Sequence, residues 1–178
     1  MDAEIKTESS TPAPKFIKAH EEVPSAAPKI GGFLIVVAVL LVFSFFANLG
    51  NLGWSLVPLR GDTWERLTTP GFTSYHPYWK PVLLFDAISA VVILVLNVIV
   101  LVLFFRRHRL FPTLMVVLLP VFFVVMIAGY YLDGLVPAIA ASQAYAKQRD
   151  SLIGKFILMH LWIPYFVVSD RVKRTFIR

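Results

Sequence analysis

Two long apolar runs joined by four basic residues decide the fold of this chain: residues 82–132 read VLLFDAISAVVILVLNVIVLVLFFRRHRLFPTLMVVLLPVFFVVMIAGYYL. The first run, 82–105, holds one charged residue, Asp86, and the second, 110–132, holds none. Because a helix rises about 1.5 Å per residue, each run covers the roughly 30 Å of a bilayer's hydrocarbon. The RRHR turn at 106–109 is very short, so the two runs form an antiparallel helical hairpin across a membrane.

Two further apolar stretches, about 30–52 and about 152–169, flank this hairpin. The core of the first is interrupted only by Ser44, whereas the second is shorter and less apolar. A cleaved signal peptide is the competing interpretation of 30–52, but the tail before it contains acidic residues and the apolar stretch exceeds an ordinary signal core. The sequence therefore predicts an all-α membrane protein, a four-transmembrane-helix bundle over residues 30–177.

The segments outside the spans are polar or interfacial. Residues 1–29 are rich in Pro, Ala, Ser, Glu and Lys and have no sustained apolar period, which predicts a disordered N-terminal tail. The loop 53–81 carries five Trp and Tyr residues, which favour the headgroup level of a bilayer. Asp62 followed by Glu65 resembles a capping box, so we expect a short interfacial helix near residues 63–68.

The composition agrees with a bilayer-embedded chain. Of the 178 residues, 57% are hydrophobic and 16% are charged, and the mean hydropathy is +0.71; a soluble domain is usually about half apolar and a quarter charged. The absence of cysteine excludes disulfides, thiolate metal sites and cysteine nucleophiles. The formal charge of +6 collects beside the ends of the apolar runs, so the expected partner is the lipid bilayer and not nucleic acid.

Lysine and arginine are divided unequally between the two sides of the predicted membrane domain. Eleven lie on the side of the chain ends: Lys6, Lys15, Lys18, Lys29, Arg106, Arg107, Arg109, Arg171, Lys173, Arg174 and Arg178. Six lie on the other side: Arg60, Arg66, Lys80, Lys147, Arg149 and Lys155. By the positive-inside rule, the sequence predicts a multi-pass protein of an inner (cytoplasmic) membrane with both termini cytoplasmic.

Several polar side chains fall at hydrocarbon depth, where they are costly and usually face the interior of a bundle. The candidate intramembrane cluster is Ser44, Asn48, Asp86, Asp133, Lys155 and His160. One interpretation is that it converges on a cavity that opens outward, with any buried carboxylate paired to Lys155 or His160. Structural roles carry more weight, because Ser and Asn commonly join helices by hydrogen bonds and charged residues near the interface are often ordinary wet helix ends.

The sequence offers no catalytic constellation. It contains no Gly-rich phosphate loop, HExxH, GxSxG or CxxC motif, so no catalytic residue is nominated. The four histidines are scattered at positions 20, 76, 108 and 160 without metal-ligand spacing, so neither a metal nor a cofactor is predicted.

The end of the chain carries a family resemblance. Residues 162–176, WIPYFVVSDRVKRTF, resemble the signature W-x-P-Y-F-x-x-S-x-R-V-K-x-T-F of bacterial domain-of-unknown-function family twenty-five sixty-nine, which includes YdgK-like four-span inner-membrane proteins. The opening IGGFL at 30–34 resembles the family's I-G-G-W-L start, with Phe33 in place of Trp. Residues 75–77 (YHP) and Asp86, where Glu is common, also resemble the pattern. The resemblance covers about residues 30–177, implies a four-span inner-membrane protein and supplies no activity.

The C-terminal motif also has a physical interpretation as a stop and an anchor. Pro164 is expected to bend the last span, Trp162 and Tyr165 to place rings within the bundle or at its edge, and Ser169 to end the helix by a local hydrogen bond. Three basic residues then meet lipid phosphates and the negative end of the helix: Arg171, Lys173 and Arg174. A docking surface for another membrane protein is the alternative for these residues.

Taken with the missing catalytic motifs, these features favour a non-catalytic accessory or interaction component that contacts another membrane protein. A small transporter or ligand sensor built on the polar cluster is the second hypothesis.

Overall fold

Four long helices make up most of the chain in a computed structural model, which describes residues 32–176 except for the side chain of Arg171. The helices that are long and apolar enough to cross a membrane are α1 (Phe33–Leu56), α3 (Trp79–Phe105), α4 (Leu110–Asp133) and α6 (Gln143–Val168). The short helices are η1 (Val57–Leu59), α2 (Asp62–Thr68), α5 (Pro137–Ala140) and α7 (Asp170–Thr175). The predicted all-α, four-span architecture is confirmed, while the predicted disordered tail 1–29 lies outside the described residues.

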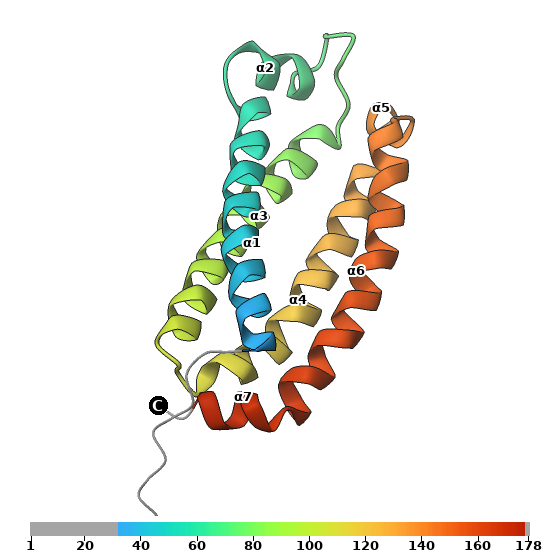
Figure 1. Ribbon diagram of the computed structural model, residues 1–178. Helices are drawn as coiled ribbons and strands as arrows, with labels where there is room; N and C mark the ends of the chain where they lie inside the picture. The colour runs from blue at the N-terminus through green and yellow to red at the C-terminus, as the bar shows by residue number, and fades with distance from the viewer. Residues whose placement is uncertain (1–31, 177–178) are drawn as a thin grey trace, which may run out of the picture.

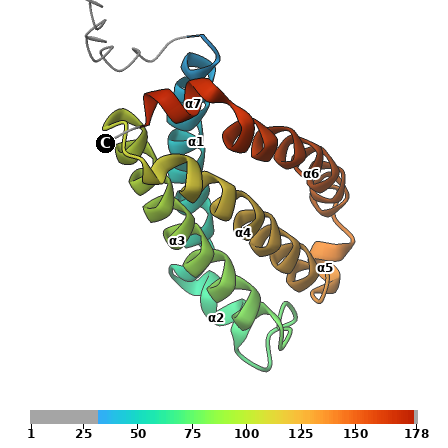
Figure 2. The same ribbon diagram turned by 90° about the horizontal axis from the view of Figure 1, so that it is seen from below.

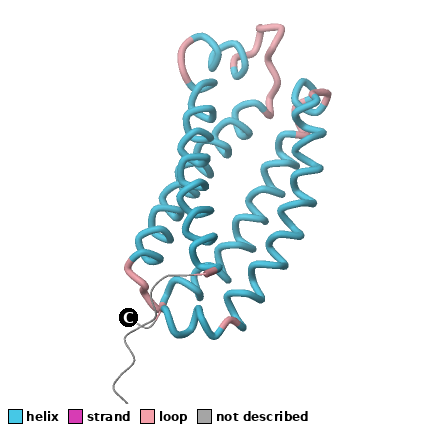
Figure 3. Tube along the Cα trace, viewed as in Figure 1, coloured by secondary structure: helices cyan, strands magenta, loops and turns pink. Residues whose placement is uncertain are grey.

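Consecutive long helices pack against one another, α1 on α3, α3 on α4 and α4 on α6 (Figures 1 and 2). One end of the bundle holds the start of α1, the turn 106–109 and α7, and we call it the basic end (Figure 1). The opposite end holds α2 and α5, and we call it the loop end. The connecting segments lie at these two ends (Figure 3).

The hairpin between α3 and α4 is closed by local hydrogen bonds. The backbone turns at Arg107, whose φ is 53°, and the ring Nδ1 of His108 accepts a hydrogen bond from the backbone N–H of Leu110 at 3.2 Å. This bond satisfies one of the free N–H groups at the start of α4. α3 therefore ends at Phe105 and α4 begins at Leu110, the positions expected from the sequence.

α6 begins at Gln143, well before the position near 152 that the sequence predicted. Ser142 caps the helix, because its hydroxyl oxygen accepts a hydrogen bond from the backbone N–H of Tyr145 at 3.2 Å. The ring of Tyr145 also stacks on Tyr130 of α4, with ring centres 4.5 Å apart. These contacts stabilise the polar first part of α6, which the length of the apolar stretch alone does not predict.

The expected interfacial helix is present as α2, but the predicted capping box is wrong. Gly61 occupies the N-cap position with φ 61°, and no side chain caps the helix. This backbone conformation favours glycine. Asp62 and Glu65 instead lie in the first turn, where negative charge complements the helix dipole.

The tightly packed core lies at the basic end. Phe104 and Phe111 have no exposed surface, and the ring of Phe111 lies 5.1 Å from that of Phe104 and 4.6 Å from that of Phe176. Val172 and Thr175 of α7 are also fully buried. α7 crosses the ends of the long helices (Figure 2), so its apolar face closes the bundle at this end.

Candidate functional site

A cavity of about 610 Å³ lies between the long helices, and all four of them contribute to its wall. The polar side chains on the wall come from α1, α3 and α6: Ser44, Asn48, Asn51, Asp86, Ser89, Asn97, Gln148 and Lys155. The contribution of α4 is apolar and includes Leu119, Phe122 and Met126. The cavity is therefore amphipathic, with polar walls facing an apolar one.

The polar residues of α1 and α3 follow the helical repeat. Positions 44, 48 and 51 are four and three apart and so share one face of α1. α1 and α3 are joined within this stripe by a hydrogen bond from Asn97 Nδ2 to Ser44 Oγ at 2.7 Å. Asp86 lies three turns along α3 from Asn97, about 16 Å nearer the loop end. The polar stripe therefore runs from the middle of the membrane domain toward the loop end.

The deepest polar side chain in the cavity has an unused acceptor. Asn97 is 6% exposed, and within residues 32–176 its Oδ1 has no hydrogen-bond partner. A buried acceptor without a donor is costly in an apolar surrounding. Asn97 Oδ1 is therefore free to accept a hydrogen bond from a donor in the cavity.

Two opposite charges line the cavity from different helices. Neither the carboxylate of Asp86 on α3 nor the ammonium of Lys155 on α6 forms an ion pair or side-chain hydrogen bond in the described part of the chain. The predicted pairing of a cluster carboxylate with Lys155 or His160 is wrong. Asp133 instead accepts a hydrogen bond from Gln148 Nε2 at 3.1 Å.

His160 does not join the cavity that Lys155 lines. Its side chain is exposed, its Nδ1 lies 2.9 Å from the backbone oxygen of Phe156, and its ring packs on that of Phe156 with centres 4.1 Å apart. Residues five apart on a helix point about 140° away from each other. The expectation that His160 and Lys155 share one site is therefore wrong.

Of the predicted cluster, the structure brings four residues to the cavity wall: Ser44, Asn48, Asp86 and Lys155. Asp133 lies at its margin through the bond to Gln148, and its charge interacts with that of Asp86. Gln148 is a wall residue that the sequence analysis does not nominate, because the predicted last span begins only near residue 152. Its spacing of seven from Lys155 is the signal that places both on one helix face.

The two stretches that carry the family resemblance meet at the basic end. The ring of Phe33, from the opening stretch, lies 5.4 Å from Trp162 and 4.7 Å from Tyr165 of the C-terminal motif. Phe166 is buried against Phe111. The aromatic motif residues are therefore part of the packing that closes the cavity toward this end.

The rest of the motif forms the joint between α6 and α7. Ser169 ends α6 through its backbone N–H, which donates to the oxygen of Tyr165 at 3.1 Å, and its hydroxyl accepts from the backbone N–H of Val172 at 3.4 Å. Local bonding at Ser169 was expected. Lys173 and Arg174 are exposed, and Pro164 lies inside α6. The side chain of Arg171 lies outside the described part, so its predicted anchoring role stays a prediction.

The fold and the cavity together define a class: a four-helix membrane protein with an internal amphipathic cavity that is closed at one end. A family model described as "Protein of unknown function (DUF2569)" matches residues 27–177. The chain belongs to this family, as the C-terminal motif indicated. No curated protein and no solved structure matches the chain.

Proposed function

We propose that this chain is a bacterial inner-membrane protein with both termini in the cytoplasm, which acts by binding a ligand in its cavity rather than by catalysis. A ligand sensor or a small transporter works in this way. The observation that supports the proposal is that one cavity gathers three polar groups with no partner among the described residues: the carboxylate of Asp86, Oδ1 of Asn97 and the ammonium of Lys155.

The cost of these groups argues that they serve a bound molecule. An unpaired charge or acceptor at hydrocarbon depth is unfavourable, and such residues commonly mark ligand or ion pathways. Asp86 and Lys155 make no side-chain bond between helices in the described part of the chain, and the core cluster at the basic end is formed by apolar and aromatic residues. Water or a polar ligand therefore offsets the cost of keeping them in the cavity.

The distribution of basic residues supports an outward-facing site. The turn 106–109 and α7 carry basic residues and lie at the same end as the start of α1 (Figure 1). By the positive-inside rule this end faces the cytoplasm. The packed aromatic residues then close the cavity on the cytoplasmic side, and the polar stripe rises from Asn97 toward the outside.

Cysteine labelling tests the site and its orientation together. The chain has no cysteine, so single Asn48→Cys and Leu49→Cys variants are free of background. Asn48 lines the cavity, and Leu49 lies beside it at the same depth but is 47% exposed on the outer surface, which lipid covers. We expect a membrane-impermeant maleimide added outside intact cells to modify Asn48→Cys and not Leu49→Cys. Equal labelling of the two, or labelling of Asn48→Cys only after permeabilisation, would refute an outward-opening cavity.

A second candidate, docking of another membrane protein, is supported by α7. Two buried residues fix this helix on the bundle, Val172 within it and Phe176 directly after it, while Lys173 and Arg174 remain exposed. The test is copurification: a partner retained by wild type and lost in Lys173→Gln/Arg174→Gln, with unchanged thermal stability, supports docking. A wild-type protein that purifies alone as a stable monomer from gently solubilised membranes contradicts it.

A further inference from the structure

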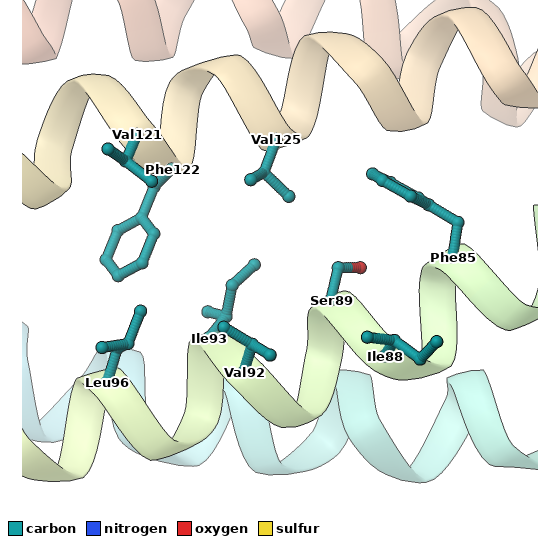
Figure 4. A pocket seen from close by; sticks show the side chains of 9 residues that line it. All are labelled: Phe85, Ile88, Ser89, Val92, Ile93, Leu96, Val121, Phe122 and Val125. Carbon is teal, nitrogen blue, oxygen red and sulfur yellow. The ribbon is translucent and has the colours of Figure 1, made fainter.

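Two apolar side pockets adjoin the polar cavity. The first, of about 260 Å³, lies between α3 and α4, whose side chains point toward one another across it (Figure 4). The second, also of about 260 Å³, lies between α4 and α6. Phe122 of α4 lines both side pockets and the cavity. The three spaces therefore meet around one side chain.

The first side pocket shares much of its wall with the cavity. Five residues line both: Phe85, Ser89, Ile93, Phe122 and Val125. The same pocket includes Ile88, Val92 and Val121, which are 62%, 50% and 44% exposed on the surface that lipid covers. This side pocket can therefore hold a hydrocarbon chain, because it is apolar, adjoins the polar cavity and reaches the lipid-facing surface of α3 and α4.

The charged side chains in the cavity indicate which polar groups a bound molecule with a hydrocarbon chain would carry. The carboxylate of Asp86 on the cavity wall pairs favourably with a cation. The ammonium of Lys155 calls for an anion and belongs to the cavity and to the second side pocket. Both charges lack partners in the part of the chain that the structure describes. One molecule that carries both an ammonium and an anionic group satisfies both residues.

We propose that the ligand is a zwitterionic phospholipid of the phosphatidylethanolamine type, with its ammonium at Asp86, its phosphate at Lys155 and its acyl chains in the side pockets. This inference rests on the proposed function, since it names the ligand of that site. A purely anionic lipid leaves Asp86 unpaired beside Asp133. A soluble zwitterion leaves the apolar pockets without an occupant.

The experiment measures binding to the full-length protein purified in detergent. Phosphatidylethanolamine, phosphatidylglycerol and glycerophosphoethanolamine are added separately, and bound lipid and Tm are recorded by native mass spectrometry and thermal unfolding. We expect phosphatidylethanolamine to bind and raise the Tm. Phosphatidylglycerol, which lacks the ammonium, and glycerophosphoethanolamine, which lacks the chains, should each bind about tenfold more weakly or worse, as the loss of a charged hydrogen bond or of buried chain surface predicts.

Substitutions at the two charged residues test whether they bind the lipid headgroup. Asp86→Asn and Lys155→Met should each weaken phosphatidylethanolamine binding by about tenfold or more. The matched controls Asp62→Asn and Lys147→Met remove exposed charges outside the cavity and should leave it unchanged. Since Lys155 is itself exposed, Lys155→Met alone carries the test if Asp86→Asn does not fold.

The possible outcomes distinguish failure of the lipid assignment from failure of the proposed binding site. Equal binding of phosphatidylglycerol refutes the role of Asp86, and equal binding of glycerophosphoethanolamine points to a soluble zwitterion and refutes the lipid. Wild-type binding by both charge variants refutes the inference as a whole. If no lipid binds while Asn48→Cys is labelled from outside, the lipid assignment fails and the proposed function stands. If Asn48→Cys is not labelled, the proposed function fails as well.

Discussion

Replacing Asn97 by leucine tests whether this polar residue of the cavity stabilises the fold or serves a bound ligand. The two side chains branch at the same carbon, so the substitution removes hydrogen-bonding atoms with little change of shape. The variant loses the bond from Asn97 Nδ2 to Ser44 Oγ. Ser44 is not left without a partner, because its hydroxyl donates to the backbone oxygen of Leu41 at 2.8 Å.

The expected change in the free energy of unfolding follows from two opposing effects. Side-chain hydrogen bonds between membrane helices contribute about 0.6 kcal/mol on average and about 1.7 kcal/mol at most. Removing a buried acceptor that has no partner, here Asn97 Oδ1, recovers about 1–3 kcal/mol. The net effect of Asn97→Leu therefore lies between a loss of about 0.7 and a gain of about 2.4 kcal/mol.

The assay is reversible unfolding in bicelles, with Ser44→Ala and the double variant completing a mutant cycle. The coupling energy between the two positions should not exceed about 1.7 kcal/mol, and the stability of Asn97→Leu should lie between about 0.7 kcal/mol below and about 2.4 kcal/mol above that of wild type. The same variant should lose ligand-dependent stabilisation if the cavity binds a ligand. A loss of more than about 2 kcal/mol refutes the reasoning, since it exceeds the largest value for such a bond and makes Asn97 a structural residue.

Three further predictions concern packing. Phe111→Ala should lower the free energy of unfolding by about 3–5 kcal/mol in denaturant titrations, because the ring is fully buried; Phe43→Ala, at a ring that is 71% exposed to lipid, should change it little. Gly134→Ala places a carbon 2.5 Å from the hydroxyl of Tyr145, so it should cost about 1–3 kcal/mol and disturb the start of α6, measured as faster amide exchange there. Ser142→Ala removes the cap of α6 and should cost about 1 kcal/mol, with faster exchange at the N–H of Tyr145 and unchanged exchange in α3.

The middle of the fold is readable from the sequence because its signals are local. Residues 82–132 contain two apolar runs and a basic turn, and each signal lies within a few residues of the boundary it sets. The start of α6 is different. It depends on the ring of Tyr145 stacking on Tyr130 and on Gln148 bonding to Asp133, and neither contact is visible until α4 and α6 lie side by side.

The candidate site, like the fold, could be predicted from the sequence only in part. The spacing of Ser44 and Asn48 places both on one helix face, and the structure puts both on the cavity wall. His160 was grouped with Lys155 because both are ionisable, although their spacing of five already separates their directions by about 140°. Helical geometry within one span is therefore a better guide than residue type. The contact of Phe33 with Trp162 joins opposite ends of the chain, so no local pattern predicts it.

The tight packing and the polar cavity lie at different ends of the bundle. We therefore expect substitutions at the two ends to affect different properties of the protein. At the basic end, the helices are brought together mainly by aromatic rings and by the buried face of α7, which also contains the fully buried Thr175. The cavity begins where that packing stops, at the Asn97–Ser44 bond between α3 and α1. Asp86 and Lys155 make no such side-chain bond to another helix in the described part of the chain. Substitutions at the aromatic contacts should therefore reduce stability first, whereas substitutions at Asp86 or Lys155 should change ligand response while stability is kept. Parallel loss of both properties at Asp86 would mean that the cavity is part of the packing and not a binding site.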